Sequence, residues 1–277
     1  MRALLLTALL LALVSTPCRL LAQGAPPSAW WANQVLTNPA FTGTTFGVRV
    51  AGGIRAVRAG LSEAASGSPD RFVGYLAVDG PAMLGYSEHG LGIAYRFEEL
   101  GGPGTRVQNA HLKYSYHLPL TEFQSLRFGA EVGLNNARLP DTRTGTGSNF
   151  RNVEGPSRTI ESWGLGVVYY HKNFFAASSF HHLSSIYRDS ELPPIDFRYS
   201  FQAGGKLPLD NDGGNKMALS PVLLVQTQGG RTDVAAHAIY RYKILTAGFG
   251  WRHQHGPSTQ LGFTFGAVSF GYLFDAD

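Results

Sequence analysis

The sequence predicts an all-β protein: a transmembrane antiparallel β-barrel of about 12–14 strands, preceded by a short irregular N-terminal segment. Three observations lead to this prediction. Apolar and polar residues alternate along most of the chain, Gly and aromatic residues are abundant, and only 15% of the 277 residues are charged. Soluble proteins have roughly 25% charged residues. Because successive side chains of a strand point to opposite faces, each alternating stretch has one apolar and one polar face.

Residues 125–135 show the alternation most clearly. Every second position is apolar, at Leu126, Phe128, Ala130, Val132 and Leu134. The positions between them are charged, polar or Gly: Arg127, Gly129, Glu131, Gly133 and Asn135. This pattern predicts a strand with one face against an apolar environment and the other against a polar one.

Residues 1–22 have the features of a secretory signal peptide. Arg2 supplies the positive charge, and residues 4–14 form an apolar stretch that is too short to span a membrane as a helix. Small residues near Ala22 allow cleavage. Cys18, the only cysteine, lies inside this segment, and a lipoprotein anchor there is the alternative, although Thr16-Pro17 is a poor context for acylation. The mature chain would then contain no thiol or disulfide.

Residues 23–43 do not alternate. Asn38-Pro39 followed by Gly43 indicates turns, and a short amphipathic turn or helix is expected over residues 29–36. Two interpretations stay open for this segment: an irregular lead-in, or a segment that packs at the mouth or in the lumen of a barrel formed by residues 44–277.

Alternating stretches then follow steadily to the end of the chain. The expected strands cover residues 45–55, 71–79, 91–97, 110–118, 126–134, 163–169, 174–183, 197–203, 216–227, 234–242, 245–251, 261–265 and 270–274. Long polar connections are expected at 139–158 and 184–194, and short turns elsewhere. Strands of about ten residues match the length that crosses a bilayer at a tilt.

A β-sandwich would also alternate, but two features favour the barrel. Aromatic residues occur near strand ends on the apolar faces, as in an interfacial girdle: Tyr114, Tyr116, Tyr169, Tyr170, Tyr240, Tyr242 and Trp251. Charged residues that would face the lumen are Lys113, Arg127, Glu131, Arg198, Arg241 and Arg252. A charge on the lipid face would cost about 2–4 kcal/mol at the midplane. In the lumen these residues fit either a structural ion-pair network, which we favour, or a solute pathway.

Short motifs also follow one another in a recognisable order. They are Asn38-Pro39-Ala40-Phe41-Thr42-Gly43, Gly90-Leu91-Gly92, residues 114–120, Leu126-Arg127-Phe128-Gly129, residues 164–170 with Gly164, Gly166 and Tyr169, Phe174-Phe175, His182-Leu183, Ser220-Pro221 and Gly271-Tyr272-Leu273-Phe274-Asp275. This order resembles the PorP/SprF family of type IX secretion system membrane proteins. Two departures are Arg55-Ala56-Val57-Arg58, where the family usually has Arg-x-x-Trp, and the end of the chain, where the resemblance implies one further strand.

The resemblance implies a non-enzymatic outer-membrane barrel of a Bacteroidota-type bacterium that serves protein secretion or gliding motility. Its partners would be large secreted adhesin-like proteins, other secretion-system subunits and outer-membrane lipid. It would hold or help to export this cargo at the cell surface. A porin-like diffusion channel is the alternative function.

Other chemistry has weaker support in the sequence. His181, His182, Ser184 and Asp189 can be arranged on paper as a hydrolase triad, but no spacing brings a nucleophile to its base. His253 and His255 share a strand face as a metal site would require, without a third ligand in register. The net charge of +4 is spread along the chain and indicates no nucleic-acid partner. No cofactor motif is present.

Overall fold

Burial alternates along the strands, with the apolar side chains on the outside. In β4 (Thr105–Thr121), Lys113 and Ser115 are buried, whereas Leu112 beside them is 60% exposed. In β5 (Gln124–Arg138), Glu131 is buried and Leu134 is 57% exposed. A soluble domain has the opposite arrangement. An apolar outer face with a polar inner face is the arrangement of a β-barrel in lipid.

The computed structural model describes residues 30–45, 47–57, 71–82, 88–100, 105–138, 142–144, 151–153, 155, 157–183, 197–210, 216–253 and 256–275. The expected signal peptide with Cys18, and most of the two long polar connections, lie outside these residues. Among the described residues, no helix has both the length and the apolar character needed to cross a membrane.

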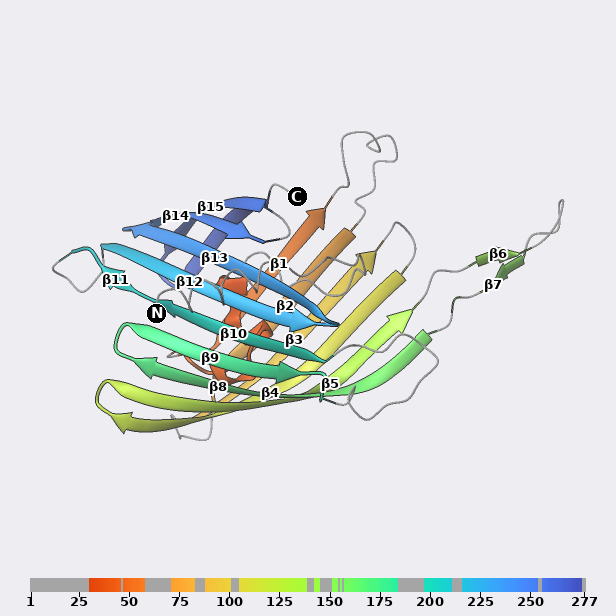
Figure 1. The fold of residues 1–277 in the computed structure, drawn as a ribbon, viewed down its shortest axis with the longest axis horizontal. Helices are drawn as coiled ribbons and strands as arrows, with labels where there is room; N and C mark the ends of the chain where they lie inside the picture. Colours follow the sequence, from red (N-terminus) through yellow and green to blue (C-terminus); the bar gives the residue numbers. More distant parts are fainter. Residues whose placement is uncertain are drawn as a thin grey trace, which may run out of the picture.

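Fourteen strands form one antiparallel sheet (Figure 1), which confirms the predicted fold class. Besides β4 and β5 they are β1 (Arg49–Val57), β2 (Arg71–Pro81), β3 (His89–Leu100), β8 (Ser157–His171), β9 (Phe174–His181), β10 (Arg198–Gly205), β11 (Leu207–Pro208), β12 (Met217–Gln228), β13 (Arg231–Tyr242), β14 (Leu245–Arg252), β15 (Gly256–Phe265) and β16 (Val268–Asp275). Strands that follow one another along the chain pair with each other, with two exceptions. β5 pairs with β8, and β12 pairs with both β10 and the short β11.

Connections alternate between the two ends of the sheet because neighbouring strands run antiparallel. Two-residue turns at 122–123, 172–173, 243–244 and 266–267 lie at one end, which we call the short-turn end. The connections 58–70, 139–156 and 182–197 lie at the other end, the long-loop end. Within one of them, β6 (Thr142–Thr144) and β7 (Arg151–Val153) form a separate two-stranded sheet.

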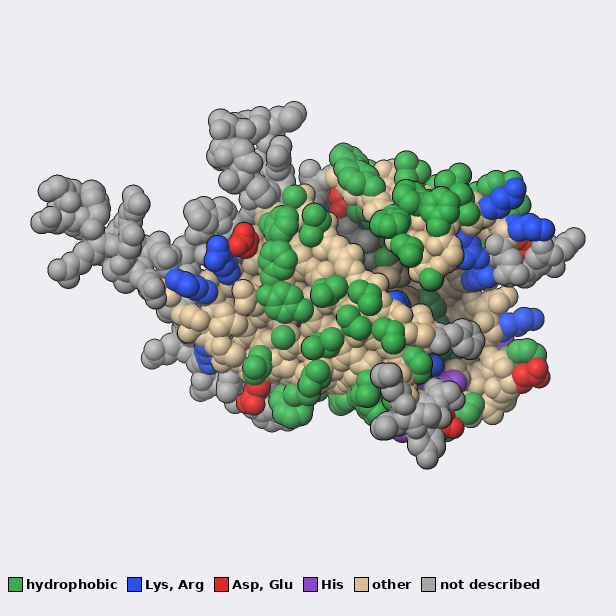
Figure 2. Space-filling model, turned by 180° about the vertical axis from the view of Figure 1, so that it is seen from behind, with side chains coloured by type: hydrophobic (Ala, Val, Ile, Leu, Met, Phe, Trp, Pro, Cys, Tyr) green, Lys and Arg blue, Asp and Glu red, His purple; other side chains and the backbone are tan. Residues whose placement is uncertain are grey.

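The sheet curves so that its first and last strands come together. Thirteen strands follow one another in the pairing order, so β1 and β16 run in the same direction. No ladder joins them among the described residues, but Arg55 Nη2 lies 3.1 Å from Asp275 Oδ2 across the seam. Seen from behind, the molecule is hollowed between two parts of its apolar surface (Figure 2).

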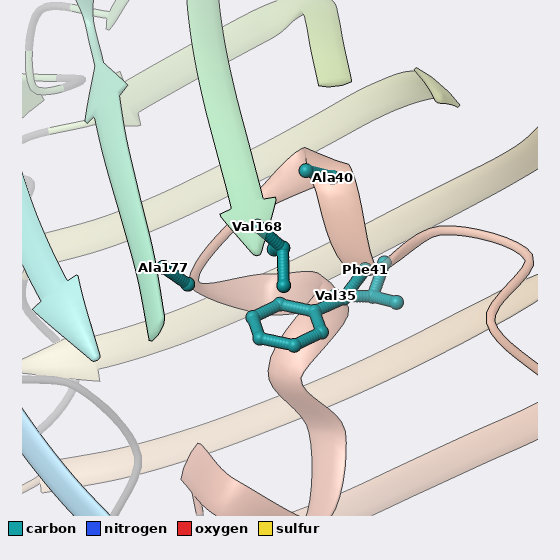
Figure 3. Close-up of a cluster of buried hydrophobic side chains, with 5 residues drawn as sticks. All are labelled: Val35, Ala40, Phe41, Val168 and Ala177. Carbon is teal, nitrogen blue, oxygen red and sulfur yellow. The ribbon is translucent and has the colours of Figure 1, made fainter. Parts of the chain in front are cut away.

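An inner segment, residues 30–43, packs against the polar face of this sheet. It contains the 3₁₀ turns η1 (Trp30–Leu36) and η2 (Pro39–Phe41). Trp30 is fully buried against Leu224 of β12 and Ala235 of β13. Phe41 and Val35 pack with Val168 of β8 and Ala177 of β9 (Figure 3). The inner segment therefore contacts strands from both halves of the sheet.

Some expectations differ from the structure in detail. β1 begins at Arg49 rather than at residue 45, because Thr45 Oγ1 donates to Gly47 O and holds a turn there. The expected connection 139–158 contains β6 and β7, and β8 already begins at Ser157. Tyr169 and Tyr170 cannot both join an outer girdle, since adjacent strand residues face opposite sides. Tyr170 packs against the inner cluster around Phe41.

Candidate functional site

Asn38 fixes the centre of the inner segment to the wall. Its Oδ1 accepts a hydrogen bond from Ala40 N at 2.8 Å and caps η2. Its Nδ2 donates to the backbone oxygens of Val167 at 3.3 Å and Ser178 at 3.0 Å. These two residues are register partners in β8 and β9. One amide thus satisfies a turn and two wall carbonyls, and Asn38 is completely buried.

The wall is free of side chains where the inner segment lies closest to it. A Cβ on Gly129 of β5 would overlap the backbone of Pro39 and Ala40. A Cβ on Gly166 of β8 would overlap Asn38 Oδ1 and lie 3.1 Å from Pro39 Cδ. These two glycines allow η2 to lie directly on the sheet, because any larger residue would push it away.

The last turn of the inner segment depends on a buried carboxylate, Asp79, and on the left-handed backbone conformation of Gly43. Gly43 has φ of +65°, and its N–H donates to Asp79 Oδ2 at 2.8 Å. Arg49 Nε pairs with the other oxygen of Asp79 at 2.9 Å. A Cβ on Gly43 would come within 2.6 Å of Gly90 Cα, so both strain and space favour Gly here.

Two further side chains approach the same turn from the wall. Ser115 Oγ donates to Thr42 O at 2.6 Å. Arg127 Nη1 lies 3.4 Å from Thr42 O and 3.3 Å from Gly43 O and donates to both. The carbonyl end of the inner segment is therefore bound by β4 and β5 as well as by β2.

The carbonyl oxygen of Thr37 is a second anchor point. Ser179 Oγ donates to it at 2.7 Å, and Ser200 Oγ lies at 3.4 Å. His181 Nε2 lies 2.7 Å from the same oxygen. Strands β9 and β10 thus converge on one backbone group of the inner segment.

His181 connects this anchor to a buried carboxylate. Its Nδ1 lies 2.5 Å from Glu131 Oε1. The other oxygen, Oε2, pairs with the ammonium of Lys113, which lies directly opposite Glu131 in the β4–β5 ladder. His111 Nδ1 lies 3.6 Å from Oε1. Because all four side chains are buried, this ion pair is sheltered from screening by water.

A chain of hydrogen-bonding side chains extends the network along the inner face. His111 Nε2 lies 3.1 Å from Asn135 Oδ1, and Asn135 Nδ2 lies 3.2 Å from His182 Nδ1. Ser162 Oγ is 3.0 Å from the same nitrogen of His182. Strands β4, β5 and β8 are thereby joined to the residue that follows β9, which stiffens the wall behind the inner segment.

The six charged residues assigned to the lumen from the sequence belong to different contacts. Lys113 and Glu131 pair with each other, and Arg127 binds the inner segment. Arg252 Nη2 pairs with Asp233 Oδ2 at 2.5 Å near β13 and β14. Arg198 and Arg241 are half-buried on β10 and β13. The structure therefore brings only part of this set together.

The family-motif residues separate into two groups. Asn38, Pro39, Ala40, Phe41 and Gly43 meet the motif of residues 164–170, since Asn38 lies on Gly166 and Phe41 packs on Val168. Gly164 leaves room for Glu131, because its Cβ would lie 2.7 Å from Glu131 Oε1. Tyr169 contacts Phe174 on β9. Gly271 and Tyr272 lie on the exposed last strand, apart from this cluster.

The catalytic and metal-binding candidates from the sequence are not brought together as a site among the described residues. His181 and His182 belong to the network above, whereas Ser184 and Asp189 lie outside the described residues. His253 is described and contacts Trp251, but His255 is not described. Over the described ranges, no group of three or more His, Cys, Asp or Glu residues is placed to hold a metal ion.

Several residues of the site were not singled out from the sequence: Asp79, His111, Ser115, Asn135, Ser162, Ser179 and Ser200. Their common signal is a polar residue or His in the middle of a strand, on the face opposite the apolar one. That signal gives a face but not a partner. Together with the inner segment these residues form a hydrogen-bonded interior that holds the segment in place.

Comparison with known proteins gives a match to a family model and similarity to solved structures. No curated protein matches the chain. A crystal structure of a Pseudomonas aeruginosa FadL homologue is similar to it, with 11% identity, 74% of this chain and 70% of that chain covered, and a TM-score of 0.42. The family model described as type IX secretion system membrane protein PorP/SprF matches residues 22–277. This chain therefore belongs to the PorP/SprF family of type IX secretion system membrane proteins.

Proposed function

We propose that this protein is a non-enzymatic outer-membrane barrel of the type IX secretion system that docks or anchors specific secreted proteins at the cell surface. Membership of the PorP/SprF family supports a place in that system. The observation that carries the rest is the occupied interior: the protein's own residues 30–43 bind the inner face of the sheet through Thr37, Asn38 and Gly43. A docking component needs no open channel.

The outer face fits this location. Large apolar side chains on neighbouring strands are about half exposed, among them Ile93 and Leu165, and Figure 2 shows apolar side chains grouped over the outer surface of the sheet. Transfer of such a surface from water to lipid is favourable by roughly 25 cal/mol per Å². Outer-membrane lipid is thus the first partner, reached after export and cleavage of a signal peptide at residues 1–22.

The long-loop end is the proposed docking surface. Bacterial outer-membrane barrels have short periplasmic turns and longer extracellular loops. By that rule the connections 139–156 and 182–197 face the exterior, and the two-residue turns at 122–123 and 172–173 face the periplasm. Large secreted adhesin-like proteins and other secretion subunits would be bound at the long-loop end.

A deletion strain tests the proposal. Without the gene, one or a few secreted proteins should disappear from the cell surface, as measured by surface biotinylation and quantitative mass spectrometry. A variant in which a short Gly-Ser turn replaces residues 139–156 should insert normally yet fail to restore them. A matched variant with residues 211–215 of the short-turn end shortened should restore them. An unchanged surface proteome in the deletion strain would contradict the proposal.

Planar-bilayer recording separates docking from a diffusion channel. If the inner segment seals the interior, the purified barrel should show no steady conductance. A stable open pore in the native protein would instead favour solute transport through an interior lined by charged residues such as Arg127 and Arg252.

A further inference from the structure

A polar pocket of about 50 Å³ lies beside the inner segment and takes no part in anchoring its last turn. Leu36 and Thr37 form one side of it. The Arg, Lys, His and Glu side chains that line the rest are Arg96, His111, Lys113, Glu131, His182 and Arg198. They come from β3, β4, β5, the residue after β9, and β10, so five parts of the wall meet the inner segment here.

The pocket holds more positive than negative charge. Lys113 and Glu131 neutralise each other. Arg96 Nη2 donates to Glu98 Oε2 at 2.9 Å, and Arg71 Nη2 forms an ion pair with Glu98 Oε1 at 2.5 Å, so two guanidinium groups share one carboxylate. Arg198 has neither a hydrogen bond nor an ion pair among the described residues, and its Nε atom is buried. The surplus positive charge is concentrated at Arg198.

Arg198 is half-buried, and the carboxylate that acts on it, Glu131, is already paired with Lys113. A partly desolvated guanidinium with so little compensation is unfavourable, because its lost hydration is not replaced in full. Its planar fork of N–H donors matches the spacing of two oxygens of a carboxylate or phosphate. The pocket also exceeds the roughly 10–15 Å³ that a single water requires, so a group of several heavy atoms fits. The charge, the donor geometry and the size of the pocket all favour a small anion with at least two oxygens.

We propose that this pocket binds a small oxyanion, a carboxylate or a phosphate, through the guanidinium of Arg198, since the other two cations that line it, Arg96 and Lys113, are already paired with Glu98 and Glu131. Thr37 and Leu36 border the pocket, so a bound anion holds the inner segment against β10 and β3 as well as against its other anchors. This site is independent of cargo docking at the loops.

Anion-dependent stability of the full-length protein in detergent tests this site. The thermal midpoint, followed by intrinsic tryptophan fluorescence, is compared in chloride, inorganic phosphate and acetate at equal ionic strength. Phosphate, acetate or both should raise the Tm of the native protein, because a ligand that binds only the folded state stabilises it. The anion that acts identifies the source. Arg198→Gln should weaken the binding at least about tenfold and remove the rise.

Two variants make the result decisive. Arg106→Gln removes an exposed arginine that pairs with Glu99 on the same barrel, and it should keep the full anion response. Arg198→Lys retains the positive charge without the planar set of guanidinium N–H donors, and it should keep part of the anion response. Folding of each variant is checked by heat-modified migration on gels. No rise with either anion in the native protein, or an equal rise in Arg198→Gln or in Arg198→Lys, would overturn the proposal.

Discussion

Asn38 lies directly on Gly166, so that a Cβ at position 166 would overlap its Oδ1 atom. The two residues are far apart in the chain and come from the two most detailed family motifs. Their contact explains why these motifs need those residue types: a short polar side chain that can bond the turn and the wall at once, and a residue with no side chain beneath it.

Replacing Asn38 by Ala should loosen the inner segment. The change removes the cap on Ala40 N and the donor to the oxygens of Val167 and Ser178. Loss of such bonds in a buried position costs about 1–3 kcal/mol. Urea unfolding in detergent micelles measures it. The control is Asn136→Ala on β5, where Asn136 bonds the hydroxyls of Ser157 and Thr159 at the exposed surface and the change in unfolding free energy should be small. Equal effects would contradict the anchoring role.

A larger residue at Gly129 should expel the inner segment while leaving the sheet intact. The Cβ and methyl groups of Gly129→Val would occupy the space of the Pro39–Ala40 backbone. Backbone cannot move aside as a flexible side chain can, so η2 must leave the wall. We expect the variant to fold and to conduct ions in planar bilayers, and its N-terminal segment to become sensitive to protease.

Gly47→Val is the matched control for that experiment, since a Cβ at Gly47 meets nothing within 4 Å. The Gly47→Val barrel should not conduct ions, and its N-terminal segment should remain protected from protease. If Gly129→Val is as silent as the control, the inner segment does not seal the interior.

Breaking the buried ion pair should destabilise the whole barrel. Glu131→Gln leaves the ammonium of Lys113 buried without a counter-charge and weakens the contact with His181. Removing one partner of a buried pair costs about 3–5 kcal/mol. Glu99→Gln breaks the exposed pair with Arg106 and should cost about 0–1 kcal/mol. Both values come from denaturant unfolding at fixed detergent concentration.

A double variant separates charge from packing at the same place. Lys113→Met combined with Glu131→Leu removes both charges, and it should recover part of the stability that Glu131→Gln loses. A double variant as unstable as the single one would mean that contacts with His181 and His111, rather than the ion pair, dominate there.

The sequence predicts the faces of this molecule well and its contacts poorly. Period-two alternation is a local property, so it identifies β5 and puts Lys113 and Glu131 on the polar side of their strands. The short turn at 122–123 even makes β4 and β5 natural neighbours. Nothing local relates Thr37 to His181, whose contact spans 144 residues. Such contacts depend on how the inner segment crosses the barrel, which only tertiary structure decides.

The number of strands could be bounded but not fixed from the sequence. The pairing order contains thirteen strands. The last of them, β16, is exposed on both faces, since the adjacent residues Gly271 and Tyr272 are both exposed. In lipid, unpaired strand edges are costly because water cannot replace the missing hydrogen bonds. Among the described residues, the ion pair between Arg55 and Asp275 is a contact that ties the first strand to the last.

Reversing the charge at one side of the seam should weaken the barrel, and reversing both should repair it. Arg55→Asp places two carboxylates together next to Asp275, whose side chain is only 8% exposed. Asp275→Arg does the converse at Arg55, and the double exchange restores an opposite pair. Coupling energies between residues in contact are about 0.5–3 kcal/mol. A double-mutant cycle on unfolding in phospholipid vesicles should give a value in that range with the exchange more stable than either single variant. Strict additivity of the two single changes would show that the seam is held by something other than this ion pair.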